Sequence, residues 1–375
     1  MNNAKVGIIG GGLSGLYAAY LLEQKSIDYL VLEARDRLGG RIESISLCDS
    51  ENTEGSDIAE HSDNCFDLGP SWYWPEFQTQ LSRLVQSLGL TSYQQYEDGD
   101  MMMERSANEP PMRMRGYTNS PSSIRISGGM KALTDALAPS LPSNKIKINH
   151  KVKEIKKSEK GVQLTIFDKN GKENKCLVSH VFLALPPRIV SETLLFAPAL
   201  PHELKQQWQQ TATWMAPHAK YFAVYDKPFW REQGLSGSAR SMLGPLNEIH
   251  DASIPNGPGA LFGFLGVPAH SRQSLTDDEL KHYCRMQLVR IYGEQAKTPI
   301  MELYKDWSAD PFTATLEDKN SNGQHAKAPP AMINSGEWKG VLYGIGSEWS
   351  EQFPGYTAGA IDAADAAVNY FIRQR

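Results

Sequence analysis

Apolar residues open the chain in the order strand, helix, strand. Residues 6–9 form a short run rich in β-branched side chains, which is typical of a buried parallel strand. Residues 16–24 follow with apolar side chains at helical spacing, and Tyr29–Leu32 is a second apolar run. The pattern therefore predicts a βαβ unit at the start of the chain.

Three glycines occupy the first strand-to-helix turn, in the spacing Gly10-x-Gly12-x-x-Gly15. Gly10 permits a tight turn, Gly12 lets a pyrophosphate approach the backbone, and Gly15 lets helix and strand pack closely. Glu33 ends the second strand, about 20 positions on, where it can accept hydrogen bonds from a ribose. A glycine-rich turn without a ligand is the alternative, and the flanking strand and helix count against it. We therefore predict a dinucleotide site.

The rest of the chain alternates between helical and strand patterns. Helices are expected over residues 75–90, 129–139, 204–215, 275–292 and 360–375. Strands are expected over residues 145–149, 152–156, 162–168, 173–178, 181–185, 261–267 and 340–345. Asn170-Gly171 predicts a hairpin turn between two of these strands.

Composition narrows the classes of protein. With 375 residues, 41% of them hydrophobic, and a net charge of −5, the chain is an ordinary globular protein of one large or two smaller domains. Nothing in it suggests nucleic acid or an anionic membrane as a partner. The four cysteines are scattered without metal-ligand spacing, so we expect no metal site and a reducing cytoplasm. No stretch approaches 18 apolar residues, so no membrane span is expected.

The segment Glu33-Ala34-Arg35-Asp36-Arg37-Leu38-Gly39-Gly40-Arg41 resembles the signature of the flavin-dependent amine oxidase superfamily. In that superfamily this segment runs over the FAD pyrophosphate, so the resemblance implies FAD as the cofactor. Gly346-Ser347-Glu348-Trp349 and the segment from Phe353 to Ala360 resemble the closing motifs of the same superfamily. The residues that the resemblance and the glycine pattern assign to FAD are Gly10, Gly12, Leu13, Ser14, Gly15, Glu33, Ala34, Arg35, Gly39, Gly40, Arg41, Gly69, Val152, Gly346, Ser347, Glu348 and Thr357.

Two residues are implied as catalytic by the same resemblance. The segment from Ala219 to Trp230 resembles a substrate-domain strand in which a lysine holds a water near flavin N5, and Lys220 matches that lysine. Tyr356 matches a tyrosine that stacks beside the substrate. A solvated lysine at a strand end is the alternative for Lys220. His218, which alternates to the same strand face, is a weaker candidate.

Other parts of the chain depart from the superfamily. Most of its helical substrate subdomain is missing around residues 91–125. After Trp307-Ser308-Ala309-Asp310-Pro311-Phe312 no cysteine follows, so we expect FAD to be bound non-covalently. Glu317 could offer a carboxylate to a cationic substrate, with a solvated surface position as the alternative. Trp72 is either a substrate-side wall or a packed core residue.

The expected fold is α/β, with an FAD-binding Rossmann-like domain and a smaller α+β substrate domain that contains a mixed sheet. We expect the FAD-binding domain to comprise residues 1–75, 127–208 and 335–375, and the substrate domain residues 76–126 and 209–334. The resemblance implies oxidation of a primary or secondary amine to an imine, with hydride transfer to flavin N5 and reoxidation by O2 to H2O2. The alternatives are a desaturase or oxidase of an apolar or polycyclic substrate, and a non-catalytic flavoprotein.

Overall fold

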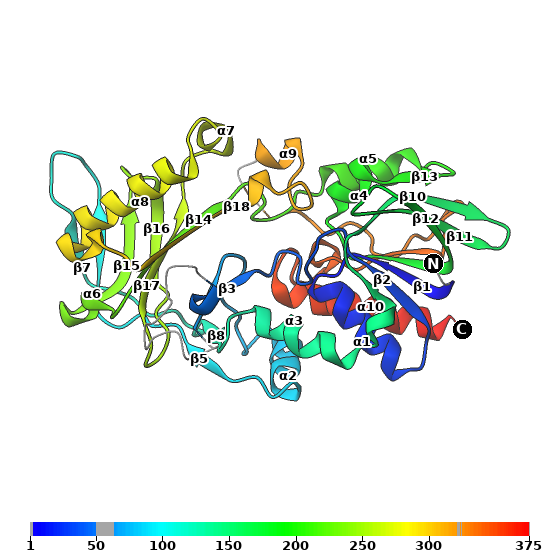
Figure 1. Cartoon of the computed structure of the whole chain (residues 1–375), viewed down its shortest axis with the longest axis horizontal. Coiled ribbons are helices and arrows are strands. Elements are labelled where there is room, and N and C mark those ends of the chain that lie inside the picture. Colours follow the sequence, from blue (N-terminus) through cyan, green and yellow to red (C-terminus); the bar gives the residue numbers. More distant parts are fainter. Residues whose placement is uncertain (1–2, 50–63, 321–322, 324, 375) are drawn as a thin grey trace.

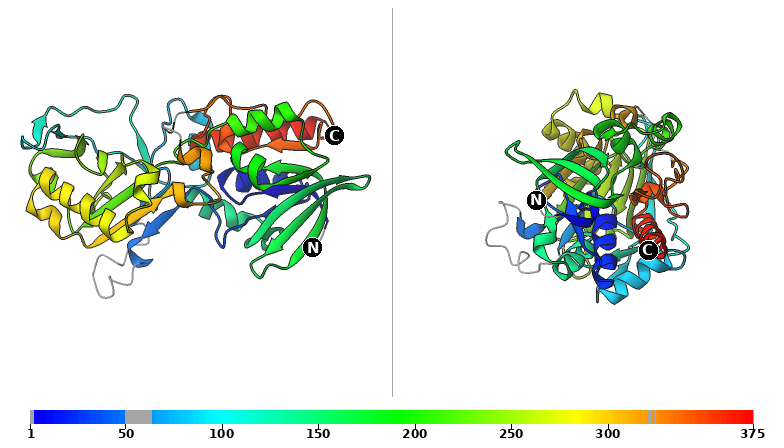
Figure 2. Two further views of the ribbon diagram at one scale, coloured as in Figure 1. Left: turned by 90° about the horizontal axis from the view of Figure 1, so that it is seen from above. Right: turned by 90° about the vertical axis from the view of Figure 1, so that its right-hand side faces the viewer.

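Two large sheets lie side by side along the long axis of the molecule (Figure 1). The computed structural model describes residues 3–49, 64–320, 323 and 325–374. The left view of Figure 2 shows that the first sheet lies in the same half of the molecule as both ends of the chain. The second sheet is built from the middle of the chain, between residues 100 and 306.

The first sheet has eight strands and combines parallel and antiparallel pairing. Its centre is parallel, with β12 (Glu173–Leu183), β1 (Ala4–Ile9), β2 (Tyr29–Leu32) and β9 (Ile146–Lys147) side by side. The beginning of β12 pairs antiparallel with β11 (Gly161–Asp168), and its end pairs parallel with β19 (Leu342–Gly344). β10 (His150–Ser158) and β13 (Leu195–Ala197) complete the sheet. The predicted βαβ start and the hairpin at Gly171 are both confirmed.

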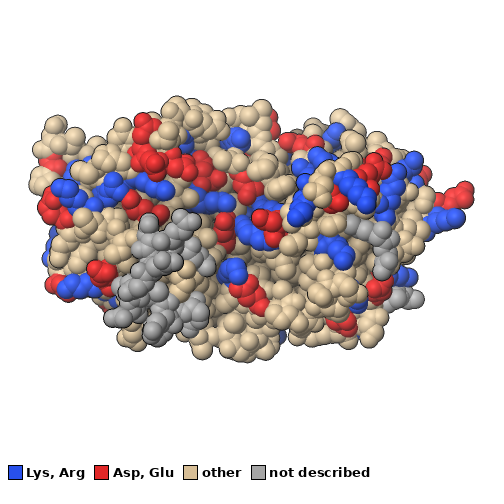
Figure 3. All heavy atoms as spheres, viewed as in Figure 1, with Lys and Arg blue, Asp and Glu red and all other residues tan. Residues whose placement is uncertain are grey.

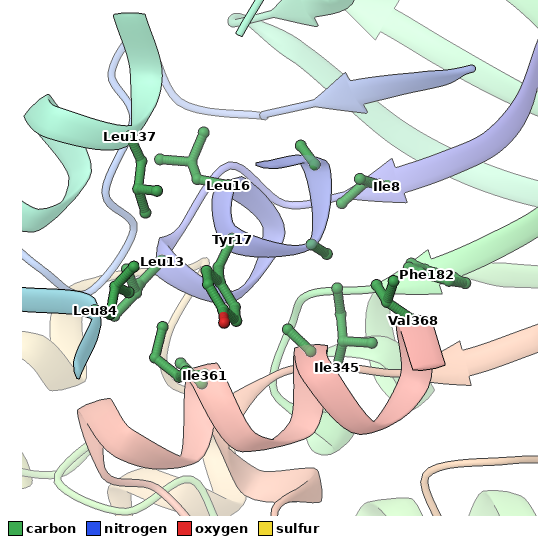
Figure 4. Packing of buried hydrophobic residues seen from close by; sticks show 14 of the residues in the cluster. Ile8, Leu13, Leu16, Tyr17, Leu84, Leu137, Phe182, Ile345, Ile361 and Val368 are labelled. Atoms are coloured by element: carbon green, nitrogen blue, oxygen red, sulfur yellow. The ribbon is translucent and has the colours of Figure 1, made fainter. Parts of the chain in front are cut away.

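Helices α1 (Leu13–Gln24) and α10 (Thr357–Arg373) pack on this sheet and on each other, although they come from opposite ends of the chain. Figure 4 shows Leu13 and Tyr17 of α1 close to Ile361 of α10, in the cluster that also contains Val368. The helix interface is lined by small buried residues of α10, namely Ala360, Ala364 and Ala367. These short side chains let the two helices approach closely. α3 (Lys131–Leu137), α4 (Pro187–Thr193) and α5 (His202–Gln210) complete this half.

The second sheet has seven strands in a largely antiparallel order. The order is β18 (Met301–Asp306), β14 (Ala219–Tyr225), β17 (Gly259–Leu265), β16 (Leu246–Asp251), β15 (Leu235–Ser241), β6 (Asp100–Glu104) and β7 (Met112–Met114). Alternation along β14 directs Tyr221, Ala223 and Tyr225 toward α8 (Asp277–Tyr292). Phe222 and Val224 point the other way, toward β4 (Cys65–Asp67). Because Lys220 shares the parity of Phe222, its side chain points toward β4 and the segment that follows it.

Short elements connect the two halves. β3 (Ser44–Ser46) pairs with β4, and β5 (Ser92–Gln94) pairs with β8 (Ile124–Ile126). α6 (Phe229–Glu232), α7 (Ala269–Arg272), α9 (Leu316–Lys319) and α2 (Thr79–Ser87) are the remaining α-helices of the described residues. Among all the residues that the structure describes, no helix is both long enough and hydrophobic enough to cross a bilayer. On the face in Figure 3, positive and negative side chains are interspersed.

Two local features bear on the predicted organisation. Leu81, Leu84 and Val85 of α2 pack in the core cluster that also contains residues of α1 and α10. The segment that follows Ala314 forms the short helix α9, because Thr315 and Asp318 form a capping box. The domain boundaries themselves stay a prediction.

Candidate active site

A cavity of about 1130 Å³ runs across the junction between the two halves. One end is lined by the turn between β1 and α1 and by the segment after β2. The other end is lined by β14, by residues 247–248 of β16 and by the segment from β17 to α7. The cavity is therefore large enough for a ligand that reaches from the first sheet to the second.

The glycine turn shapes the first end. Gly10 has a φ of +109°, and a Cβ added there would lie 2.6 Å from the carbonyl oxygen of Ala184. A Cβ at Gly15 would lie 2.0 Å from the oxygen of Gly10. Gly12, the N-cap of α1, would meet backbone atoms only at 3.7 Å and beyond, and it lines the cavity. Two of the glycines thus close the turn, and the third leaves room beside the helix start for a ligand.

Glu33 directly follows β2 and is almost fully buried. Its Oε2 accepts a hydrogen bond from the Gly11 N–H at 2.6 Å, and its Oε1 accepts one from the Arg35 N–H at 2.8 Å. The carboxylate is thus held at the cavity wall next to the glycine turn. This position fits the recognition of ribose hydroxyls.

Arg41 links a segment near the start of the chain to a segment near its end. Its guanidinium pairs with Glu348 and donates to Ser347 Oγ at 3.1 Å. Burial alone would lower the pKa of Arg41, but the charge and hydrogen bond of Glu348, together with the charges of Asp318 and Asp310, outweigh it and raise the pKa, so the group stays cationic. Gly39 and Gly40 both have positive φ and lie beside Gly12. A fixed cation, paired glycines and the start of a helix fit the pyrophosphate of a dinucleotide such as FAD.

Lys220 lies on the wall of the second half and is 5% exposed. Its Nζ donates to the carbonyl oxygens of Asp67 at 3.2 Å and Gly69 at 2.5 Å, and to Ser71 Oγ at 2.9 Å. Burial lowers the pKa of Lys220 to about 7, although the charge of Asp67 acts in the opposite direction. Because the side chain is buried, Lys220 is not a strand-end lysine that reaches into solvent. Its amine can gain or lose a proton near neutral pH.

Aromatic rings gather around the start of α10. The Tyr356 ring lies 4.6 Å from the Trp214 ring and 5.0 Å from the His325 ring, measured between centroids. Trp74 approaches Tyr356 edge-on at 6.1 Å. Tyr356, Trp214 and Trp74 all line the cavity. They form an apolar wall beside the first end of the cavity.

A carboxylate and a further tryptophan line the second end. Glu248 on β16 pairs with Arg240 at 2.7 Å and with the His250 ring at 2.9 Å. Burial would raise the pKa of Glu248, but these contacts outweigh it and lower the pKa, so the group is ionised at neutral pH. Trp72 lines the cavity and also packs on Phe262, so it is both a wall and a packed residue.

Most of the predicted site residues meet at this cavity. Those that line it are Gly10, Gly12, Leu13, Ser14, Glu33, Ala34, Arg35, Gly39, Gly40, Arg41, Gly69, Trp72, Val152, Lys220, Ser347, Tyr356 and Thr357. Gly15, Gly346 and Glu348 support the wall from behind, through close packing or through Arg41. Glu317 does not line the cavity: it is exposed on α9. The described residues contain no cluster of potential metal ligands.

Trp214 and Glu248 were missed by the sequence analysis, and His218 was rated only weakly. Trp214 follows α5 in a segment without a recognisable motif. Glu248 belongs to β16, a strand that the sequence pattern did not reveal. His218 lines the cavity one residue before β14 begins, and burial together with the charge of Arg272 lowers its pKa.

Comparison with known proteins identifies related chains. A family model described as flavin containing amine oxidoreductase matches residues 112–371, and one described as an NAD(P)-binding Rossmann-like domain matches residues 8–88. The probable flavin-containing monoamine oxidase A of Dictyostelium discoideum is 22% identical, over 95% of this chain and 94% of its own length. The putrescine oxidase of Kocuria rosea is 23% identical, over 87% of this chain and 88% of its own length.

Solved structures agree on the fold. A redesigned putrescine oxidase superposes with a TM-score of 0.79 at 21% identity, covering 100% of both chains. The cyclohexylamine oxidase of Brevibacterium oxydans IH-35A superposes with a TM-score of 0.77 at 20% identity, covering 99% of both chains. The α/β fold with a Rossmann-like domain and a second, mixed sheet is thereby confirmed.

Proposed function

This chain belongs to the family of flavin-containing amine oxidoreductases, and from that premise we propose that it oxidises a primary or secondary amine to an imine with O2 as the final electron acceptor. The protein is thus an oxidoreductase whose cofactor is FAD. The imine would then react with water to give a carbonyl compound and the released amine. We also propose that FAD is held non-covalently, since residues 288–375 contain no cysteine.

One observation carries the proposal: a single cavity contains the dinucleotide cradle at one end and Lys220 at the other. Arg41, Glu33 and the glycine turn would hold the dinucleotide. When bound there, FAD supplies the two-electron redox chemistry, as a hydride acceptor at N5 of its ring and an electron donor to O2, which becomes H2O2.

The chain's own residues handle the proton and the orientation of the amine. An alkylamine is an ammonium ion at neutral pH, and it must lose a proton before a hydride can leave its α-carbon. Uncharged Lys220, with a pKa of about 7, can accept that proton. The rings of Tyr356 and Trp214 would confine the substrate beside the first end of the cavity.

The charges of the second end support a more specific substrate. Among the described residues, the carboxylates that line the cavity are Glu33 and Glu248. Glu33 lies at the dinucleotide end, where it accepts a hydrogen bond from the Gly11 N–H. Glu248 is ionised and could attract a second positive charge at the far end of the substrate. A diamine would meet this requirement, and one relative is named a putrescine oxidase.

The desaturase alternative would require a cavity lined by apolar side chains. Lys220, His218, Asn247 and Glu248 line the cavity instead, so no observation favours that alternative. A cytoplasmic location stays a prediction of the cysteine pattern.

The decisive experiment is anaerobic mixing of the purified holoenzyme with monoamines, diamines and amino acids. We expect at least one amine to bleach the flavin absorbance band within seconds, and air to restore it with formation of H2O2. If no member of the panel bleaches the band while FAD stays tightly bound, amine oxidation is excluded for these substrates and the proposal fails.

A further inference from the structure

A second group of charged residues lies behind the cavity wall. Asp67, Arg125 and Lys220 are 1%, 2% and 5% exposed. They come from β4, β8 and β14, three strands of three different sheets. Buried charges of this kind are unfavourable unless they neutralise one another.

Asp67 is tightly held. Its Oδ1 accepts hydrogen bonds from the Ser44 hydroxyl at 2.6 Å and from the Met130 N–H at 2.8 Å. Its Oδ2 lies 3.9 Å from Arg125 Nη2. In the described part of the chain, nothing accepts a hydrogen bond from Arg125 Nε or Nη1. Asp67 is therefore the counter-ion of Arg125. Burial raises the pKa of Asp67, and the charge of Arg125 is the strongest influence in the opposite direction, so Arg125 favours the anionic carboxylate.

Lys220, in contrast, has only uncharged hydrogen-bond partners. Its Nζ donates to two backbone carbonyls and to the Ser71 hydroxyl. On the neighbouring strand β17, the rings of Phe262 and Phe264 lie within 4.8 Å and 5.2 Å of Nζ. Lys220 can lose a proton without leaving Ser71 unpaired, because the hydroxyl can then donate to the neutral nitrogen.

Two other charged groups near Lys220 have partners of their own. Lys305, opposite Lys220 on β18, donates to Glu43 at 2.8 Å, and Glu248 on β16 pairs with Arg240. His218 lies one residue before β14 begins, and burial lowers its pKa, which favours the uncharged ring. Asp67 and Arg125 are the two charges that act on Lys220, one attractive and the other repulsive.

We propose that Arg125 is a positioning residue for Lys220: as the buried counter-ion of Asp67, it leaves Lys220 free to be an uncharged amine at the cavity wall. A buried cluster is most stable when its net charge is zero. With Arg125 present, zero is reached by cationic Arg125, anionic Asp67 and neutral Lys220. Without Arg125, the same balance would require Lys220 to keep its proton. Only the role of neutral Lys220 as the acceptor of the substrate proton rests on the proposed function.

The test is the titration of Lys220 itself, which needs no turnover. The holoenzyme is labelled with [ε-¹³C]lysine, its carbon resonances are followed against pH, and the Lys220 signal is assigned by its absence in Lys220→Arg. We expect a midpoint near pH 7 in the wild type, and a rise of about one to three pH units in Arg125→Met. Arg125→Lys, which keeps the charge, should restore the lower midpoint.

A matched control is Arg188→Met. Arg188 is also a buried arginine paired with an aspartate, Asp318, but it belongs to α4 and faces neither Lys220 nor Asp67. The Lys220 midpoint should be unchanged in this variant. An equal rise in both variants would mean that general loosening moves the midpoint, and it would overturn the proposal.

Other outcomes are equally decisive. A wild-type midpoint near 10, or an unshifted midpoint in a folded Arg125→Met variant, would overturn the proposal. If Arg125→Met does not fold, Asp67→Asn decides, because loss of the carboxylate should lower the midpoint, and no change would refute the link. If the enzyme oxidises no amine, the proposed function is refuted, but the titration of Lys220 still tests the role of Arg125.

Discussion

Lys220 owes its chemistry to where its side chain is buried and not to any unusual neighbour in sequence. Three uncharged acceptors and two aromatic rings surround the amine, and burial lowers its pKa to about 7. An amine with that pKa is partly uncharged at neutral pH, which suits a group that accepts a substrate proton. The ionisation of Glu248 also depends on its surroundings, since its contacts with His250 and Arg240 lower its pKa and keep it ionised in the cavity wall.

Lys220→Met is expected to lower kcat/KM for the best amine on the order of 10²-fold at pH 8. The wild-type value should rise as pH increases through about 7, because the proton acceptor is the neutral form that exists above its pKa. The variant should lack that ionisation in its pH–rate profile. Lys305→Met is the control, because Lys305 bonds to Glu43 and does not line the cavity. An unchanged acid limb in Lys220→Met would remove Lys220 from the proton transfer.

Glu248→Gln tests whether the second end of the cavity binds a cation. We expect KM for a diamine to rise about 10-fold, since one charge-assisted contact is lost. KM for a monoamine of similar length should change little, which makes it an internal control. Steady-state kinetics with both substrates would measure the difference, and parallel changes for both would show that Glu248 does not discriminate between them.

The β1–α1 turn shows how one short element combines folding and ligand binding. Gly10 and Gly15 are required because any Cβ there would collide with backbone atoms. Gly12 has an ordinary φ of −75° and would meet only ordinary contacts. It is therefore the cavity, and not the fold, that a side chain at Gly12 would disturb.

This difference gives a matched pair of variants. Gly15→Ala is expected to lower the free energy of unfolding by about 2 kcal/mol or more, since its Cβ would lie 2.0 Å from the Gly10 oxygen. Gly12→Ala should unfold like the wild type when both are measured without FAD, yet bind FAD more weakly. Thermal unfolding and FAD titration of the apoprotein would separate the two effects. Equal loss of stability in both variants would contradict this division of roles.

Ion pairs between distant segments join the two halves of the molecule. Arg35, after β2, pairs at 2.7 Å with Asp310, which follows β18 of the second sheet. Burial alone would raise the pKa of Asp310, but the charge and hydrogen bond of Arg35, together with the Phe312 N–H and the charge of Lys305, outweigh it and lower the pKa. Arg41 and Glu348 make a similar contact between the first and last parts of the first half.

Asp310→Asn is expected to lower the free energy of unfolding by about 1–3 kcal/mol at pH 7. Because the folded pKa of Asp310 lies below its unfolded value of about 3.9, this stability is complete above pH 5 or so and is lost as pH falls through the folded pKa. Denaturant unfolding at several pH values should show the gap between wild type and variant closing in acid. The exposed carboxylate of Asp135, paired with Lys131, is the control, and Asp135→Asn should cost at most about 0.5 kcal/mol. A gap that persists unchanged at pH 3 would contradict an ionic origin.

Much of the first half could be predicted because its signals are local. The residues of Tyr29–Leu32 form β2 with the expected bounds, and the helix after the glycine turn begins at Leu13. Glu33 and Tyr356 line the cavity as the motifs implied. Glu317 did not line it, because the family pattern around that position is absent and the chain forms the short helix α9 instead.

Glycine geometry and strand–helix alternation act between residues close along the chain, so the sequence alone predicts the dinucleotide cradle, and the resemblance of its motifs implies FAD and the family. The packing of the two halves fixes which carboxylate faces the cavity, which rings join Tyr356, and how Arg125 and Asp67 lie behind Lys220. These contacts link residues far apart in sequence, and their energies depend on burial and distance. Both quantities exist only once the two sheets have come together.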